Sequence, residues 1–183
     1  MKFIAQSIPE IILIEPDVFA DTRGSFSESF RQDLFEKALG YNVNFIQDNE
    51  SISVNGVLRG LHYQLPPLAQ AKLVRVNKGT VLDVAVDIRK SSKSFGQYVA
   101  VKLSGENKKQ LFIPHGFAHG FVVLSESAIF SYKVDNYYSA ELDRGISFDD
   151  PFINIDWNIS KKELKLSKKD MNNPLLRQTK DLF

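Results

Sequence analysis

Three residues of types that move protons or stabilise negative charge stand on otherwise apolar segments: His62, Lys72 and Tyr132. A histidine of ordinary pKa, about 6.5, accepts a proton near pH 7, and a tyrosine, with a pKa of about 10, starts protonated. A lysine ammonium that reaches into a pocket can stabilise an oxyanion. Each also has a structural interpretation: a hydrogen-bonded core histidine, a lysine at the solvated end of a strand, and a core tyrosine. The residue types therefore permit acid–base chemistry around a developing negative charge.

Arg59 belongs to the same short segment as His62, which is VLRGLHYQ at 57–64. Residues three apart on a regular strand point to opposite faces of the sheet. Both side chains reach one cavity only if the strand contains a bulge or bend, and Gly60 permits one. The alternative is a surface arginine beside a core histidine.

The other two histidines, His115 and His119, lie in IPHGFAHGF at 113–121. Their spacing would place both on one face of a helix, but Gly116 and Gly120 disfavour a helix here. The pattern Pro-x-Gly-x-x-His resembles the second motif of the cupin barrels. Metal-binding cupins supply His-x-His and Glu from a first motif, whereas the matching segment 60–64 has one histidine and no carboxylate. Because transition metals take three or more protein ligands as a rule, we expect no metal.

Period-2 alternation of apolar and polar residues dominates the elements that must hold these side chains. The predicted strands are 72–77, 80–88, 98–103, 110–113, 120–124 and 128–134. Helices are expected at 32–39, before Gly40, and near 161–164 or 168–171, after the cap residues Ser160 and Ser167. Short strands at this spacing predict an all-β antiparallel sandwich or small barrel with a few short helices.

Composition sets limits on the kind of protein. The chain has 183 residues, 43% hydrophobic and 25% charged, with a net charge of +1 and no cysteine. This size suits one domain, and the charge favours neither nucleic acid nor a membrane as partner. A disulfide, a thiolate metal site or a cysteine nucleophile is excluded. The N-terminus lacks a signal peptide pattern, and no apolar run approaches the roughly 20 residues that span a bilayer, so we expect a soluble cytoplasmic protein.

From about Ile8 to Leu176 the chain resembles the dTDP-4-dehydrorhamnose 3,5-epimerase family. The matching motifs are short but occur in the family's order, at 21–30 (DTRGSFSESF), 47–49, 57–64, 69–75 (AQAKLVR), 83–89 (DVAVDIR), 95–96, 113–121, 132–133 and 137–138. The resemblance implies a cupin-type jelly-roll β-barrel or sandwich over 1–183, with neither metal nor other cofactor. It also implies a homodimer in which the N-terminal segment crosses to the partner subunit.

The resemblance further implies a reaction in dTDP-rhamnose biosynthesis, the conversion of dTDP-4-keto-6-deoxyglucose to dTDP-4-dehydrorhamnose by base-catalysed inversion at C3 and C5. By position, His62 would be the base, Tyr132 the acid, Lys72 the group that stabilises the enolate, and Asp170 the carboxylate that orients the histidine. The positions that match substrate-binding residues are Phe19, Arg23, Phe26, Glu28, Gln47, Asn49, Arg59, His119, Tyr138, Asp143 and Lys169.

The first four of these residues, Phe19, Arg23, Phe26 and Glu28, belong to the crossing segment and would serve the neighbour's site, whereas Tyr138 would stack on the thymine. Asp143 departs from the family, which commonly has glutamate there, and a shorter acid would reach the same hydroxyl through water.

Three alternatives remain open. The first is an enzyme of the same scaffold that inverts only C3 or only C5, or acts on another nucleotide sugar. The second is a non-catalytic sugar-binding cupin, which would need no pairing of His62 with Asp170. The third is a metal-dependent cupin oxygenase or isomerase.

Overall fold

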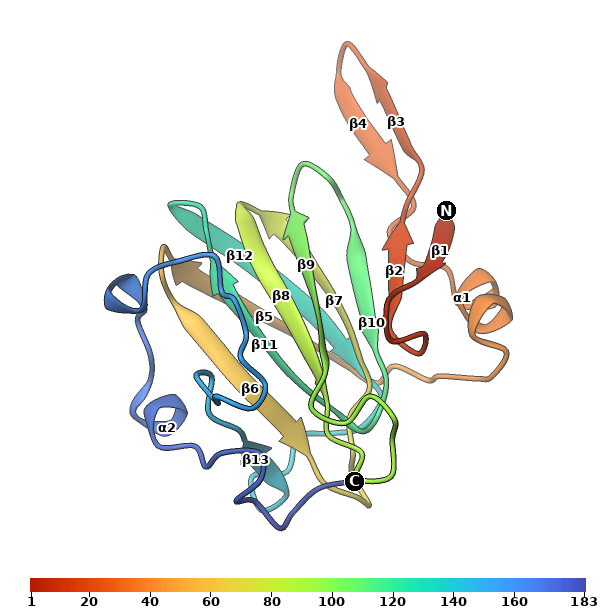
Figure 1. The fold of residues 1–183 in the computed structure, drawn as a ribbon. Helices are drawn as coiled ribbons and strands as arrows, with labels where there is room; N and C mark the ends of the chain where they lie inside the picture. The colour runs from red at the N-terminus through yellow and green to blue at the C-terminus, as the bar shows by residue number, and fades with distance from the viewer.

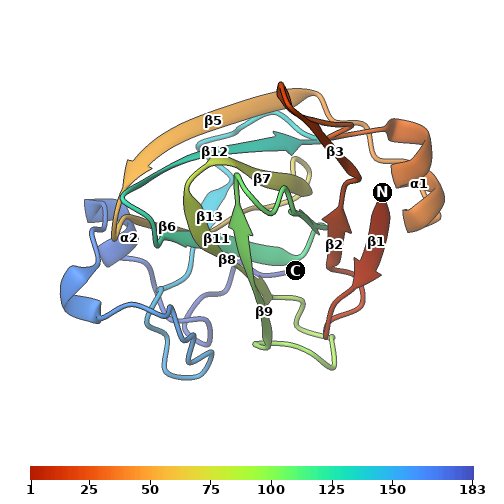
Figure 2. The same ribbon diagram turned by 90° about the horizontal axis from the view of Figure 1, so that it is seen from above.

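The computed structural model describes residues 1–183 and consists mainly of two antiparallel sheets that face each other (Figures 1 and 2). The six-stranded sheet runs in the order β1 (Lys2–Ala5), β2 (Ile12–Glu15), β10 (Gln110–Ile113), β7 (Lys72–Lys78), β12 (Ser127–Val134) and β5 (Gln47–Val54). The five-stranded sheet runs in the order β13 (Asp143–Gly145), β6 (Leu58–Gln64), β11 (Phe117–Val123), β8 (Thr80–Asp87) and β9 (Tyr98–Ser104). Most neighbouring strands are distant in sequence, as in a jelly roll, and the predicted all-β fold is confirmed.

Helices are few and short. α1 (Gln32–Leu39) ends at Gly40, which adopts φ 78° as a left-handed cap. Ser160 caps a 3₁₀ turn at Lys161–Glu163, and Ser167 caps α2 (Lys168–Met171), so both regions expected near the C-terminus carry a short element. All of these lie where the sequence predicted them.

One predicted strand needs correction, and several strands were missed. β11 begins at Phe117 rather than at residue 120, because Gly116, with φ 87°, makes the turn and His119 continues the ladder. Strands β1, β2, β5, β6 and β13 and the hairpin of β3 (Val18–Asp21) with β4 (Gly24–Ser27) were not predicted. β5 reads QDNESISV and shows no apolar alternation over its first half, so its pattern does not resemble a half-buried strand.

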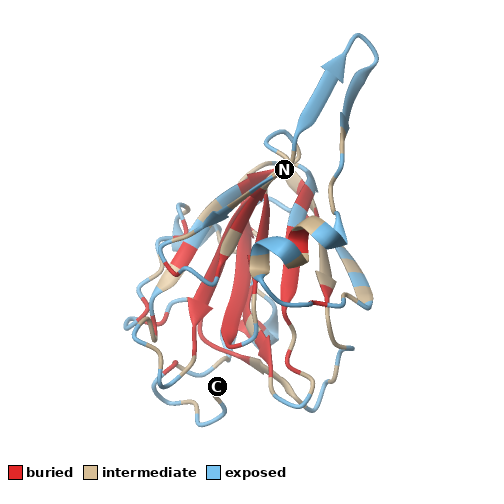
Figure 3. Cartoon of the chain, turned by 90° about the vertical axis from the view of Figure 1, so that its right-hand side faces the viewer, coloured by how far each residue is buried: buried red, intermediate tan, exposed pale blue.

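The main core lies between the two sheets. Inward-facing residues such as Val74, Val76 and Phe130 alternate with outward-facing ones along each strand. The C-terminal segment covers the outer face of the five-stranded sheet with Ile146, Trp157 and other apolar residues. α1 covers one end of the outer face of the six-stranded sheet (Figure 3). The chain therefore forms a barrel with both sheets partly covered.

The β3–β4 hairpin stands away from this barrel (Figures 1 and 3). Phe19 and Phe26 face each other across the hairpin and are 65% and 69% exposed. Neither strand pairs with either large sheet. None of the helices has the length and apolar character needed to cross a lipid bilayer.

Candidate active site

A bulge in β6 settles the direction of His62 and Arg59. His62 pairs with His119 and Arg59 pairs with Phe121, so three residue steps on β6 oppose two on β11. The extra residue reverses the alternation, and both side chains face the space between the sheets. Gly60 has φ 133°, and a Cβ there would lie 2.5 Å from the backbone of β11. A residue with a side chain does not fit this position, and the bulge is the one that the sequence required for Arg59 and His62 to reach one cavity.

His62 forms a dyad with Asp170. Its Nε2 lies 2.6 Å from Asp170 Oδ1, and Ser167 Oγ donates to Asp170 Oδ2 over 2.8 Å. Burial raises the pKa of Asp170, but the hydrogen bonds of His62 and Ser167 outweigh it and hold that pKa below its ordinary value. An ionised Asp170 accepts the Nε2 proton, which leaves the Nδ1 lone pair of His62 free to accept another. The cap of α2 thus positions the dyad.

Lys72 lies on the opposite sheet and points inward rather than to the solvated end of its strand. Its side chain is only 9% exposed, and Nζ lies 3.4 Å from the backbone oxygen of His62. Burial lowers the pKa of Lys72 to about 8, against the opposing charges of Asp143 and Asp83. The side chain is therefore mostly an ammonium at neutral pH, between the two walls of the barrel.

Tyr132 shares the wall of Lys72. It pairs with Val74 on β7, and its ring packs 6.1 Å from that of Phe130 in the core. Burial raises the pKa of Tyr132, Arg59 lowers it and Asp143 raises it, so the phenol keeps its proton at neutral pH. A phenol of the six-stranded sheet and an imidazole of the five-stranded sheet thus both point into the space between the sheets.

The inner face of β5 is polar. Gln47, Asn49, Ser51 and Ser53 alternate toward the interior, and Gln47 Nε2 donates to Asn49 Oδ1 over 2.9 Å. Arg59 Nε donates to Ser53 Oγ over 3.2 Å. The Ser51 hydroxyl is buried without a partner. This wall presents hydrogen-bonding groups where a core would present apolar ones.

Asp143 joins three elements at the rim. Its carboxylate accepts a hydrogen bond of 3.0 Å from the Tyr138 hydroxyl and forms an ion pair with Lys169. Gln47 Oε1 accepts from the backbone N–H of Tyr138. The ring of Tyr138 is 59% exposed, so it offers a planar surface at the entrance.

Four residues predicted for the site lie elsewhere in this chain. Phe19, Arg23 and Phe26 belong to the projecting hairpin, and Glu28 follows it. The Arg23 guanidinium is bound by Asp21. No contact within one chain brings these four residues to His62.

Sequence reasoning assigned no role to Asp83, Ser51 or Ser53, and it gave Ser167 only the role of a helix cap. Asp83 is fully buried and its Oδ2 lies 2.9 Å from His119 Nε2. A signal for it existed, because it is a charged residue in the middle of an apolar strand. The two serines of β5 share the alternation of Gln47 and Asn49, which would have revealed them. No group of three or more His, Cys, Asp or Glu residues is arranged to hold a metal ion, and His115 pairs instead with Asp135.

Fold and side chains together define a cupin-type jelly-roll enzyme equipped for acid–base chemistry. Residues 5–178 match the family model of dTDP-4-dehydrorhamnose 3,5-epimerase, and the chain belongs to that family. It is 57% identical over 172 residues to the dTDP-4-dehydrorhamnose 3,5-epimerase of Shigella flexneri, covering 94% of each chain.

Solved structures of epimerases share the fold of this chain. A dTDP-6-deoxy-D-glucose-3,5-epimerase from Legionella pneumophila, in complex with dTDP-4-keto-L-rhamnose, has a TM-score of 0.93 and 50% identity, covering 97% of this chain and 93% of that chain. A 3′-monoepimerase from Streptomyces bikiniensis, in complex with dTDP-quinovose, has a TM-score of 0.88 and 32% identity, covering 94% of this chain and 86% of that chain. The predicted family, fold and enzyme class, an isomerase, are confirmed, against the non-catalytic sugar-binding alternative.

Proposed function

We propose that this chain inverts C3 and C5 of dTDP-4-keto-6-deoxyglucose to give dTDP-4-dehydrorhamnose, with His62 as base and Tyr132 as acid. The observation that carries this assignment is the arrangement of the two groups. The His62–Asp170 dyad belongs to one wall of the barrel, Tyr132 belongs to the other, and the Lys72 ammonium lies between the walls.

The chemistry follows from the C4 ketone, which acidifies the hydrogens on both neighbouring carbons. His62 Nδ1 takes the proton from C3 or C5, and Asp170 stabilises the imidazolium that forms. The electron pair moves to the ketone oxygen, where the Lys72 ammonium stabilises the enolate. Tyr132 then delivers its proton to the opposite face of the same carbon. His62 returns its proton to solvent and Tyr132 regains one, so the cycle balances.

The remaining inward groups suit a nucleoside diphosphate sugar. The Arg59 guanidinium fits bidentate capture of phosphate oxygens. Gln47, Asn49 and His119 offer hydrogen bonds to the sugar and phosphates, and the exposed ring of Tyr138 suits stacking on thymine. Asp143 and Lys169 would meet the substrate at the rim. Because Asp143 is shorter than glutamate, its contact with a hydroxyl would pass through water.

We also propose that two copies pair and exchange their hairpins, so that Phe19, Arg23, Phe26 and Glu28 complete the partner's site. Two features support this proposal. The hairpin leaves its aromatic pair exposed, and exposed apolar side chains near polar ones mark interaction sites.

The outer face of the six-stranded sheet is the second feature. Beyond α1 this face is bare: Ile52 and Val54 are 69% and 53% exposed. A hollow of about 480 Å³ lies on it, lined by residues that include Phe30, Arg75 and Ser131. A second copy would cover these groups.

The cytoplasmic location stays a prediction.

Subunit complementation tests the exchange. Arg23→Ala and His62→Ala are each expected to weaken activity strongly when present in both subunits. A mixed dimer, purified through two different tags, is expected to regain activity, because one site then carries both defects and the other carries neither. Mixed dimers that form but show no recovery would mean that the hairpin serves its own chain.

Product analysis in deuterated water tests the reaction. With dTDP-4-keto-6-deoxyglucose as substrate, proton NMR is expected to show deuterium at both C3 and C5, with both centres inverted. Label at only one carbon would instead identify a mono-epimerase, an activity that the related Streptomyces fold also supports. Absence of label at either carbon would contradict epimerisation of this substrate.

A further inference from the structure

Asp83 is a buried carboxylate with half of its hydrogen-bonding capacity unused. It is fully buried, and Oδ2 lies 2.9 Å from His119 Nε2, whereas Oδ1 has no partner in the protein. A buried charged group without full pairing is costly and calls for an explanation. The mechanism above gives Asp83 no role.

The strand register turns Asp83 toward the space between the sheets, where the reacting groups also point. On β8 it alternates with Val81 and Ala85, which face the core between the sheets, and it pairs with Phe121 of β11. The ionisable groups around this space come from every neighbouring element and comprise Arg59 and His62 of β6, Lys72 of β7, His119 of β11, Tyr132 of β12, Asp143 of β13 and Asp170 of α2.

Among the carboxylates of this group, Asp83 is paired only with a histidine and keeps one oxygen without a partner. Asp170 is bound by His62 and Ser167, and Asp143 forms an ion pair with Lys169. Burial lowers the pKa of His119, so the ring beside Asp83 is neutral at neutral pH. Lys72 is the buried cation among these groups, and the charges of Asp143 and Asp83 both raise its pKa against the effect of burial.

We propose that Asp83 is a positioning residue, the counter-charge of Lys72 and the group that orients the His119 ring. Its Oδ2 accepts the Nε2 proton of His119, which leaves His119 Nδ1 as an acceptor for a substrate hydroxyl. Its free Oδ1 leaves the negative charge available to the lysine rather than neutralised by a partner. This inference rests on the role proposed above for Lys72.

The test is Asp83→Asn, which keeps the shape and removes the charge. A Lys72 ammonium that is required for turnover makes kcat fall as pH rises through about 8. Without the anion, the ammonium is lost more easily, and this alkaline limb is expected to move down by about 1 pH unit. At pH 8 kcat should fall more than KM rises. If the asparagine variant does not fold, Asp83→Thr, uncharged and suited to a strand, serves in its place.

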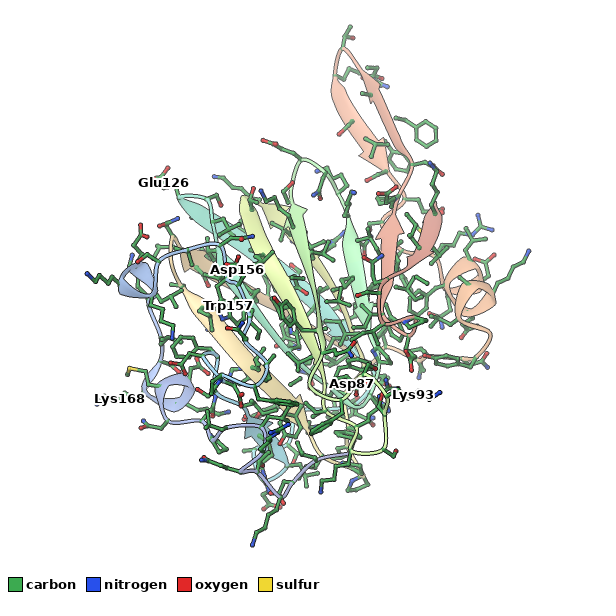
Figure 4. All side chains as sticks on the ribbon, viewed as in Figure 1. Asp87, Lys93, Glu126, Asp156, Trp157 and Lys168 are labelled. Atoms are coloured by element: carbon green, nitrogen blue, oxygen red, sulfur yellow. The ribbon has the colours of Figure 1, made fainter.

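Asp87→Asn is the matched control. Asp87 lies four residues along the same face of β8, about 13 Å away, and is also fully buried. Its carboxylate is held instead by Arg89, Ser92 and Ser94. Figure 4 places it near Lys93, on the side of the barrel away from Lys168 of α2. This variant is expected to lower Tm without moving the alkaline limb.

A folded Asp83 variant with the wild-type pH profile overturns the inference, as does an equal shift in the Asp87 variant. A wild-type protein that shows no alkaline limb near pH 8 also contradicts it. A wild-type protein that releases no epimerised sugar at any pH contradicts the proposed function itself.

Discussion

Replacing His62 by alanine is expected to abolish hydrogen exchange at both C3 and C5 and to lower kcat by about 10²–10⁴-fold. His62 is the one imidazole of the interior that combines an ionised partner with partial exposure, its side chain being 31% accessible. Asp170 is 5% exposed and occupied by His62 and Ser167, so it cannot replace the missing base. The measurement is deuterium uptake into the substrate in deuterated water, followed by proton NMR.

His115→Ala is the matched control for this variant. His115 is also a partly exposed histidine paired with a carboxylate, Asp135, at 2.8 Å. It lies in the turn between β10 and β11, outside the group of inward-facing residues around His62. Its removal is expected to leave exchange at the wild-type rate. Substantial deuterium uptake by His62→Ala would show that another group takes the proton and would end the assignment of the base.

The sequence was sufficient for strands that combine apolar, β-branched residues with turn signals at their ends. β7, β8, β9, β10 and β12 all lie where this pattern predicted them, because each carries apolar residues into the core, and β8 and β10 are buried on both faces. β5 does not show this pattern, and the reason is physical. Its inner face lines the polar site with Gln47, Asn49, Ser51 and Ser53, so the contrast between faces is lost at the place where function needs polar groups. The strand that the pattern missed is the strand that carries part of the site.

Only part of the candidate site could be predicted from sequence patterns. The sequence showed that a bulge at Gly60 would be needed to bring Arg59 and His62 together, and the β6–β11 register contains that bulge. The pairing of His62 with Asp170 joins residues 108 positions apart, and no local pattern predicts such a contact. The resemblance to a family supplied it. Asp83 was visible as a charge on an apolar strand, but its contact with His119 needed the register of β8 and β11.

Replacing Tyr132 by phenylalanine is expected to separate exchange from inversion. His62 still removes the proton and returns it to the face from which it came, so deuterium enters C3 or C5 without a change of configuration. In the proposed mechanism the proton for the opposite face comes from the phenol, whose pKa is raised by burial so that it starts protonated. Without the hydroxyl, inversion is expected to fall by about 10²–10⁴-fold. The measurement compares deuterium in recovered substrate with the yield of epimerised product.

Tyr63→Phe is the matched control, because it removes the hydroxyl of a buried tyrosine that has only a structural role. Tyr63 is buried on the outer side of β6, and its hydroxyl donates to the backbone oxygen of Asp181. Losing that hydrogen bond is expected to cost about 0.5–1.5 kcal/mol of stability while inversion continues. If Tyr132→Phe behaves in the same way, with a lower Tm and a wild-type rate of inversion, then Tyr132 is a packing residue and the acid must come from elsewhere. If exchange persists while inversion disappears, the two faces of the sugar are served by two different walls of the barrel, as the opposed positions of His62 and Tyr132 require.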